Sequence, residues 1–246
     1  MVKKSTTNMV QSSFVDLIRN PVIIIPSILL LLFSLILSQI SYRINNALTN
    51  NTSLIITIWL ILFTLVFFLA FSYFYSGLIY AGFLSINKKV KLKEIFQGSN
   101  KYWMKNFFAI LLIIISYSIV NNIVAALAFF IGKYLGLPLQ TATFFFYFLY
   151  FLGLVGFTVF LTFTSFFLIR NNHSLYKSIK ESISFTARNY IATILTLFIF
   201  FIITEVLTLL DNLVSWPYFT PSELLCYLVI YPLLVLILAR LVDTFE

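Results

Sequence analysis

Long runs of apolar residues, separated by short polar and charged segments, dominate the pattern of this chain. The longest run, Leu54–Ile86, contains no charged residue, and a helix needs only about 20 apolar residues to cross a bilayer. Because the runs are continuously apolar and not alternating, they predict membrane-spanning helices, not the strands of a membrane barrel. We expect six spans, at about 21–40, 54–86, 103–131, 141–169, 190–210 and 224–242.

Three shorter segments that precede apolar runs are amphipathic and basic. Segment 10–19 places apolar residues at helical spacing, and Ser13–Asp16 resembles the capping box that starts a helix. Segment 87–105 is predicted to contain a second such helix that ends near Gly98, and segment 171–188 a third. Helices of this kind lie in the membrane interface. We therefore expect three hairpins, each preceded by a cytoplasmic interfacial helix.

The composition agrees with an all-α polytopic membrane protein. Of the 246 residues, 61% are hydrophobic and 10% are charged, and the mean hydropathy is +1.02, which lies far outside the range of soluble domains. No polar stretch has the length of a soluble domain, so residues 1–246 are interpreted as a single six-helix transmembrane domain. Pro232 predicts a kink in the last span.

The lysine and arginine residues are distributed unevenly between the two predicted sides of the membrane. Fourteen of the 16 lie on the side that carries both termini, and only Arg43 and Lys133 lie on the other. Because short cytoplasmic loops are enriched in Lys and Arg, we predict a multi-pass plasma-membrane protein with both termini in the cytoplasm. Most of the residues that give the net charge of +8 lie in the gaps between spans or near their ends, which points to anionic lipid and not to nucleic acid.

The predicted interfacial helices thus form a basic collar on the cytoplasmic side. One interpretation is a surface that contacts anionic lipid headgroups, and the other is that these cations only set the topology. The collar residues that we expect to contact anionic lipid are Lys88, Lys89, Lys91, Lys93, Lys177, Lys180 and Arg188.

A dipeptide recurs where each predicted hairpin begins. Arg19-Asn20, Lys105-Asn106 and Arg188-Asn189 each follow a basic amphipathic stretch and open an apolar run. This regularity predicts a threefold internal repeat. The alternative is that any cytoplasmic entry into the membrane collects a basic residue and an asparagine.

Three stretches carry a resemblance to known proteins: FVDLIRNPVIIIPSILLL at 14–31, SLYKSIKESISFTARNYIATIL at 174–195 and YPLLVLILARLVDTF at 231–245. In these stretches the chain resembles a loose superfamily of six-span bacterial and archaeal membrane proteins of unknown function. That superfamily is related to the membrane domain fused to some glycerophosphodiester phosphodiesterases. The resemblance implies a fold and little chemistry, and a phosphodiesterase catalytic domain is not expected in this sequence.

Glu205 is the most distinctive candidate for function, because it interrupts the predicted fifth span. An ionisable side chain in the bilayer costs about 2.5–3.5 kcal/mol unless it meets a partner or water. Superposing the repeats places Asn122 at the depth of Glu205. The alternative is a structural role, in which the carboxyl is protonated or bonded to a neighbouring helix and the amides join helices. The candidate intramembrane polar site comprises Glu205, Asn121, Asn122 and Gln39.

No motif for nucleophilic, phosphate-binding or metal-dependent chemistry occurs in the sequence. The single histidine, His173, is expected to be a solvated loop residue, and the single cysteine, Cys226, excludes a disulfide within one chain. No metal or cofactor is predicted. Asn50 and Asn51 begin overlapping N-x-[ST] glycosylation acceptors in an outward-facing loop.

These observations favour a non-enzymatic membrane protein, an accessory or lipid-interacting protein that acts through the basic collar. The alternative is a small transporter or lipid translocase that uses Glu205 and Asn122 as its polar site. An intramembrane hydrolase ranks below both, because a paired acid and base are lacking. The expected partners are the lipid bilayer and anionic lipids; a membrane-protein partner or a homo-oligomer stays open, and nucleic acid is not expected.

Overall fold

The computed structural model describes residues 6–48, 54–134, 141, 143–144, 147–149, 159–211 and 220–245. Within these ranges all regular structure is helical, with nine α-helices, and the prediction of an all-α protein is confirmed. Five helical stretches are long and apolar enough to cross a membrane, namely Pro21–Ile40, Ile61–Ser85, Leu92–Leu127, Tyr190–Leu209 and Pro221–Thr244. The protein is thus a helical membrane protein. The predicted acceptors Asn50 and Asn51 lie outside the described residues.

Two amphipathic helices of equal length, α1 (Thr6–Arg19) and α7 (Leu175–Arg188), precede apolar segments as predicted. Each packs small polar residues against the protein, and these are buried: Ser13, Asp16, Ser178 and Ser182. Several apolar side chains on the remaining surface of these helices are exposed, including Phe14, Ile18, Tyr176 and Ile183. Exposed apolar side chains on an amphipathic helix are typical of insertion into the membrane interface.

The start of α1 differs from the prediction. The helix begins at Thr6, so Ser13 lies in its interior, and the interpretation of Ser13–Asp16 as a capping box is wrong. The Asp16 carboxylate instead accepts hydrogen bonds from the guanidinium of Arg240, at the far end of the chain. The spacing of Ser13 and Asp16 resembles a cap, but the sequence alone does not show that Asp16 has a partner at the far end of the chain.

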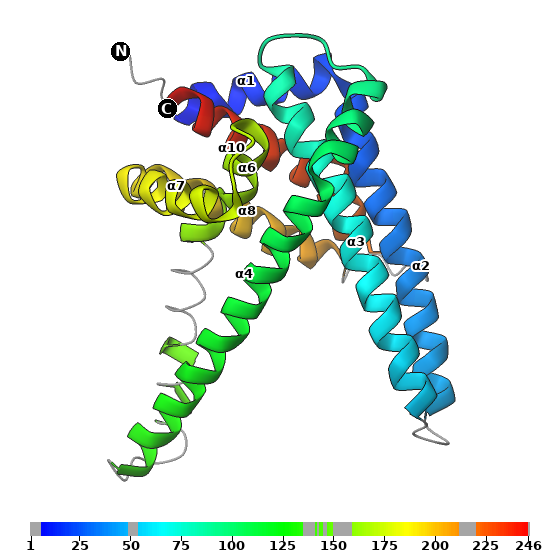
Figure 1. Ribbon diagram of the computed structural model, residues 1–246, viewed down its shortest axis with the longest axis vertical. Helices are drawn as coiled ribbons and strands as arrows, with labels where there is room; N and C mark the ends of the chain where they lie inside the picture. The colour runs from blue at the N-terminus through cyan, green and yellow to red at the C-terminus, as the bar shows by residue number, and fades with distance from the viewer. Residues whose placement is uncertain are drawn as a thin grey trace.

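The first two spans form a hairpin of long helices, α2 (Ile24–Leu48) and α3 (Leu54–Ser85). A short 3-10 turn, η1 (Pro21–Ile23), leads into α2, because proline is favoured in the first turn of a helix. The two helices lie side by side (Figure 1), and the rings of Phe33 and Phe67 stack between them with centroids 6.3 Å apart. Helix α2 extends beyond the predicted end of the span at residue 40, into the predicted loop.

Helix α4 (Leu92–Tyr134) is a single continuous helix of 43 residues. The prediction of a separate interfacial helix that ends near Gly98 is therefore wrong. Gly98 does not break the helix; a Cβ there would lie 2.3 Å from Cδ1 of Tyr80 in α3. Glycine at this position allows the Tyr80 ring to rest directly on the α4 backbone, and this packing offsets the low helix propensity of glycine.

Of the predicted fourth span, 141–169, the structure describes residues 141, 143–144, 147–149 and 159–169. Its end is described, and the apolar stretch Val159–Arg170 includes helix α6 (Thr164–Arg170). This helix lies in the core, and Phe163 just before it packs against Phe185 of α7 with ring centroids 4.8 Å apart. The Ser182 hydroxyl of α7 donates a hydrogen bond to the carbonyl of Phe160 (2.7 Å). Helix α7 therefore packs on the residues just before α6 and also donates a hydrogen bond to one of their backbone carbonyls.

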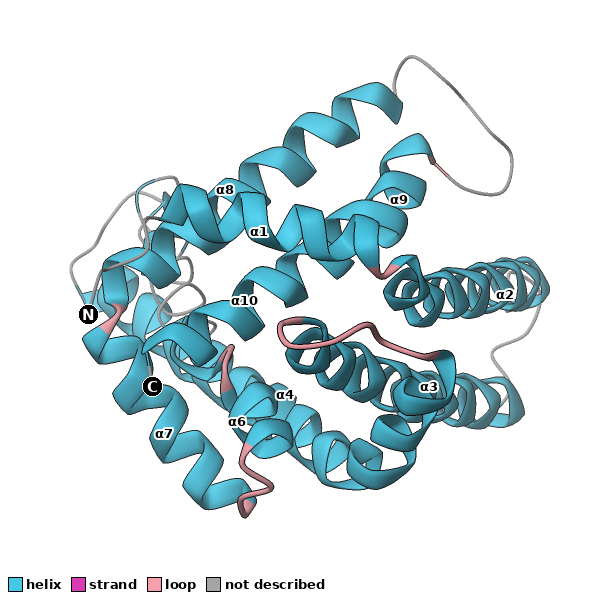
Figure 2. Cartoon of the chain, turned by 90° about the horizontal axis from the view of Figure 1, so that it is seen from above, coloured by secondary structure: helices cyan, strands magenta, loops and turns pink. Residues whose placement is uncertain are grey.

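The last two predicted spans do not lie parallel to the first hairpin. Helix α8 (Tyr190–Asp211) and the final helix α10 (Tyr231–Phe245) run across the direction of α2 and α3 (Figures 1 and 2). The structure therefore does not confirm the arrangement of six spans as three equivalent hairpins. Between α8 and α10, α9 (Pro221–Leu225) continues into a π-helical turn, η2 (Cys226–Ile230), immediately before Pro232. A π-helical turn of this kind is a local irregularity of the helix, and the kink at Pro232 stays a prediction.

Helix α10 is the centre of the hydrophobic core. Its residues Val235–Ala239, Leu241 and Val242 are all buried, and it packs against α1 and α3. In an apolar window of 18 residues, half of the residues are buried in the stretch Pro221–Thr244, against 6% in the stretch Leu92–Leu127 of α4. The C-terminal helix therefore organises the protein interior, whereas α4 leaves most of its apolar surface for lipid.

Candidate functional site

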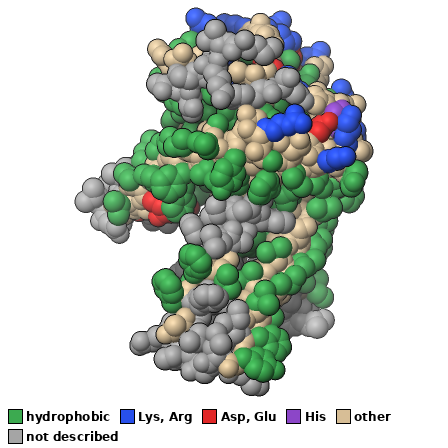
Figure 3. Space-filling model, turned by 90° about the vertical axis from the view of Figure 1, so that its left-hand side faces the viewer, with side chains coloured by type: hydrophobic (Ala, Val, Ile, Leu, Met, Phe, Trp, Pro, Cys, Tyr) green, Lys and Arg blue, Asp and Glu red, His purple; other side chains and the backbone are tan. Residues whose placement is uncertain are grey.

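Cationic side chains gather at one end of the molecule. Figure 3 shows lysine and arginine side chains in the upper part of one face, above a region dominated by apolar side chains. Lys89 and Lys91 lie in the connection between α3 and α4, and Lys93 lies in the first turn of α4; all three are exposed. On α7, Lys177, Lys180 and Arg188 are exposed as well. The basic collar is thus accessible along two elements.

The described carboxylates of α1, α4, α7 and the α10 C-terminus are all paired with cations or a histidine. Asp16 pairs with Arg240, Glu94 with Lys88 at 2.5 Å, Glu181 with His173 at 2.7 Å, and Asp243 with Arg170 at 3.0 Å. These pairs leave an excess of positive charge. The cations without an ion pair to any described carboxylate include Arg19, Lys89, Lys91, Lys93, Lys180 and Arg188.

Glu94 fixes the conformation of the α3–α4 connection. One carboxylate oxygen accepts from the Lys88 ammonium, and the other accepts from the backbone N–H of Lys91 at 2.9 Å. The second bond caps the start of α4, because it satisfies a backbone donor that has no partner within the helix. Lys88 is consequently tied to Glu94, and among the four predicted lysines of this segment it is the one engaged within the protein.

Asn20 joins the end of α1 to the same connection. Its side chain is buried; Oδ1 accepts from the backbone N–H of Val90 at 2.9 Å, and Nδ2 donates to the carbonyl of Asp16 at 3.1 Å. A buried backbone N–H without a partner is costly, so this one amide holds two segments together that are 70 residues apart. Asn20 therefore fixes the position of the α3–α4 connection, which carries Lys89 and Lys91.

The dipeptide that marks the predicted repeat makes the same local hydrogen bonds in two of its three copies. Asn20 and Asn189 each donate from the backbone N–H (2.9 Å) and from Nδ2 (3.1 Å) to the carbonyl four residues earlier, where α1 and α7 end. Asn106 differs, because α4 continues through it without a break. Its side chain is fully buried, and neither of its polar atoms has a hydrogen-bond partner in the described part of the chain.

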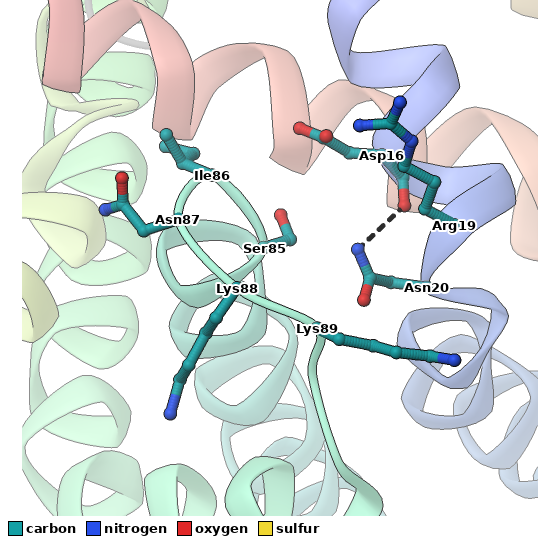
Figure 4. A pocket seen from close by; sticks show the side chains of 8 residues that line it. All are labelled: Asp16, Arg19, Asn20, Ser85, Ile86, Asn87, Lys88 and Lys89. Carbon is teal, nitrogen blue, oxygen red and sulfur yellow. Dashed lines mark hydrogen bonds between the residues drawn. The ribbon is translucent and has the colours of Figure 1, made fainter.

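An open pocket of about 410 Å³ lies between the end of α1 and the α3–α4 connection. Figure 4 shows Arg19 at the end of α1 and Lys89 in the connection, with Asn20 between them. The Ser85 hydroxyl on the floor donates to the carbonyl of Gly82 at 2.8 Å. The full set of lining residues is Asp16, Arg19, Asn20, Ser85, Ile86, Asn87, Lys88 and Lys89.

His173 is not the solvated loop residue that the sequence predicts. Its ring is half-buried; Nδ1 lies 2.7 Å from Glu181, and Nε2 lies 2.9 Å from the ammonium of Lys177. An ammonium can only donate, so Nε2 accepts from Lys177 and Nδ1–H donates to Glu181. Lys177 is therefore engaged within the protein, while Lys180 and Arg188 have no ion pair to a described carboxylate.

The structure does not join the predicted intramembrane polar residues into one site. Glu205 is exposed on α8, Gln39 is exposed on α2, and Asn122 is exposed and donates to the carbonyl of Ser118 in its own helix at 2.8 Å. Asn121 is half-buried, with Oδ1 unpartnered among the described residues. No described hydrogen bond links any two of the four predicted residues. The shared polar site stays a prediction.

Two further features bear on chemistry. Among the described residues, no group of three or more His, Cys, Asp or Glu side chains is arranged to hold a metal ion. A second pocket, of about 340 Å³, opens between α3, α4 and the start of α6, and its walls are mainly apolar. Its lining residues are Phe71, Tyr75, Ile110, Ile113, Ile114, Tyr117, Leu161, Thr162 and Ser165.

Comparison with known proteins found no matching family model, no similar curated protein and no similar solved structure. The class that the composition and fold define is a helical membrane protein with several apolar helices. The resemblance to the superfamily of six-span membrane proteins stays a prediction.

Proposed function

We propose that this protein is a non-enzymatic, multi-pass membrane protein that binds anionic phospholipids through its basic collar. The observation that supports this most directly is the charge imbalance at the collar. The carboxylates of the elements that form it are already paired, whereas Lys89, Lys91 and Lys93 are exposed and have no ion pair to a described residue. These cations stand where α3 ends and α4 begins, at the end of two long apolar helices.

Membrane electrostatics give such a surface a definite partner. A lysine or arginine close to an anionic bilayer surface contributes about 1 kcal/mol of attraction. The exposed apolar residues of α1 and α7, among them Phe14, Ile18 and Ile183, favour insertion of these helices into the same interface. Apolar insertion and cationic attraction then act at one membrane surface. The excess of cations there supports the proposal that this surface, with both termini, faces the cytoplasm.

The test measures lipid binding by the purified full chain. The protein in uncharged detergent is titrated with phosphatidylglycerol or with phosphatidylcholine of the same acyl chains, and bound lipids are counted by native mass spectrometry. We expect phosphatidylglycerol to bind about tenfold more tightly, with a preference that declines as salt rises. Equal binding of the two lipids at low salt would contradict the proposal.

A matched pair of variants separates the collar from net charge. Lys91→Gln/Lys93→Gln and Arg43→Gln/Lys133→Gln each remove two positive charges, but Arg43 and Lys133 are predicted to lie on the opposite side. The first variant is expected to lower phosphatidylglycerol binding about tenfold, and the second to leave it unchanged. Equal losses would show that total charge, and not the collar, determines binding.

The transporter alternative stays a prediction. Glu205 lines neither of the two pockets described above, and it is exposed on a helix that crosses the long hairpin. We also keep the membrane-protein partner and the homo-oligomer as open proposals, because the large apolar surface of α4 suits lipid and protein equally well.

A further inference from the structure

We infer that the pocket between α1 and the α3–α4 connection is a binding site for one phospholipid with a phosphomonoester headgroup, such as phosphatidic acid. This inference rests on the proposed function, because it names the lipid class that one part of the collar recognises. The pocket is lined by two exposed cations from different segments, Arg19 and Lys89, together with the buried amide of Asn20, which distinguishes it from the rest of the collar.

The position of the pocket corresponds to the height of the lipid headgroups. Its walls come from the residues just before Pro21, where the first span begins, and from Ser85–Lys89, where the second span ends. A lipid whose acyl chains lie along the apolar helices would therefore place its phosphate at this level. The volume of about 410 Å³ lies in the range of small-molecule sites, which measure about 300–1,000 Å³.

The charge of the pocket matches a dianion. Asp16 is neutralised by Arg240 and Lys88 by Glu94. The remaining lining charges are those of Arg19 and Lys89, both exposed and without an ion pair to a described residue. A phosphomonoester carries a charge of about −1.5 to −2 at pH 7, whereas the phosphodiester of ordinary phospholipids carries only one negative charge. Two free cations therefore favour the monoester.

The protein holds the backbone segments that carry these two cations in place before a lipid binds. Asn20 bonds to both walls of the pocket, through Val90 in the connection and Asp16 in α1. Arg19 precedes Asn20 in the chain, and Lys89 precedes Val90. The spacing of the two cationic residues is thus fixed by a buried amide, and only their side chains have to close on the phosphate (Figure 4). A fixed backbone lowers the ordering cost of binding.

The experiment compares phosphatidic acid with phosphatidylglycerol of identical acyl chains, by native mass spectrometry of the full chain in uncharged detergent. We expect phosphatidic acid to bind about tenfold more tightly at pH 7.5, and the preference to vanish near pH 5, where the monoester loses its second charge. Arg19→Gln/Lys89→Gln is expected to weaken binding of phosphatidic acid more than binding of phosphatidylglycerol, so that the two lipids bind equally. The control Lys180→Gln/Arg188→Gln should lower binding of both lipids by the same factor.

Each outcome bears on one of the two proposals. Equal affinity of the wild-type protein for both lipids overturns the inference but leaves the proposed function standing. Absence of binding to either lipid overturns both. Displacement of phosphatidic acid by millimolar inorganic phosphate shows that the site recognises free phosphate and not a lipid. If the double variant unfolds, Arg19→Lys/Lys89→Arg serves instead, because it keeps both charges and must retain the preference for phosphatidic acid. Loss of that preference in this charge-conserving variant, when it melts like the wild type, contradicts the inference.

Discussion

At the residue scale, the most informative side chain is Asn20. The sequence marks it only as the second member of a recurring dipeptide, and Asn189 shares the dipeptide and the local hydrogen bonds. The two differ in one contact, because only Asn20 also accepts a hydrogen bond from a distant backbone N–H, that of Val90. A pattern along the chain predicts local bonds well, but it carries no information about which copy meets a partner 70 residues away.

This difference predicts unequal effects of the same substitution. Asn20→Ala leaves the buried N–H of Val90 without an acceptor, and we expect a loss of about 1–3 kcal/mol in the free energy of unfolding. Asn189→Ala removes only the bond to the carbonyl of Phe185 in its own helix, so we expect a loss of about 0.5–1 kcal/mol. Thermal unfolding in detergent measures both. Similar losses would show that the contact with Val90 adds nothing.

At the element scale, the contact between α3 and α4 depends on two glycines. A Cβ at Gly98 would lie 2.3 Å from the Tyr80 ring, and one at Gly77 would lie 2.3 Å from Oγ of Ser99 and 3.2 Å from the carbonyl of Ile95. The two positions lie on opposite helices, so each helix backbone presses against a side chain of the other. Small residues allow this close approach in membranes, where packing replaces the hydrophobic effect as the force between helices.

Substituting these glycines is expected to separate the helices. Gly98→Leu places a large side chain where the Tyr80 ring lies, and we expect a loss of about 1–3 kcal/mol or more. Gly82→Ala serves as the control, because a Cβ there meets its nearest neighbour, Ala239, at an ordinary 3.4 Å. The measurement is the cross-linking yield of a cysteine pair at Ser72 and Trp103, whose side chain and carbonyl meet in the wild type, in a Cys226→Ser background. An unchanged yield in Gly98→Leu would show that Gly98 does not set the approach of the two helices.

The same scale shows what sequence patterns can and cannot predict. The apolar runs correctly predicted long helices, because a membrane span is a local property of about 20 residues. The predicted helix end near Gly98 was wrong, since packing of Tyr80 on Gly98 and the Glu94 cap favour one continuous α4. Intrinsic propensity is a weak signal that tertiary contacts override.

At the scale of the whole molecule, the unexpected feature is the orientation of α8 and α10 across the long hairpin (Figure 2). Hydropathy identified both as apolar helices but treats every span as equivalent, so it predicted three parallel hairpins. The hydropathy pattern did not predict the pocket either, because the pocket joins residues 16–20 to residues 85–89, which are distant in the sequence. Two polar contacts account for the position of α10: Arg240 meets Asp16 in α1, and Arg170 of α6 donates to the carbonyl of Val242 and to the carboxylate of Asp243, each at 3.0 Å.

Removing the ion pair between Asp16 and Arg240 tests whether this contact holds α10 in place. Their side chains are only 9% and 15% exposed, and removing one partner of a buried pair leaves an uncompensated charge that costs about 3–5 kcal/mol. Asp16→Leu alone is thus expected to lower the melting temperature strongly. Because replacing both members with apolar residues is often neutral or stabilising, Asp16→Leu/Arg240→Leu is expected to recover most of the loss.

The recovery distinguishes a role in stability from a role in position. If the double variant melts like the wild type and still prefers phosphatidic acid, apolar packing alone holds α10 across the hairpin, and the ion pair is dispensable for the pocket. If it melts normally but loses the preference, the pair is needed to orient the end of α1 beside Lys89. We expect the second result, because the fixed chain segment between Asp16 and Asn20 forms one wall of the pocket. If the loss of stability in Asp16→Leu/Arg240→Leu equals the sum of the losses in Asp16→Leu and Arg240→Leu, the two residues do not interact, and this ion pair does not position α10.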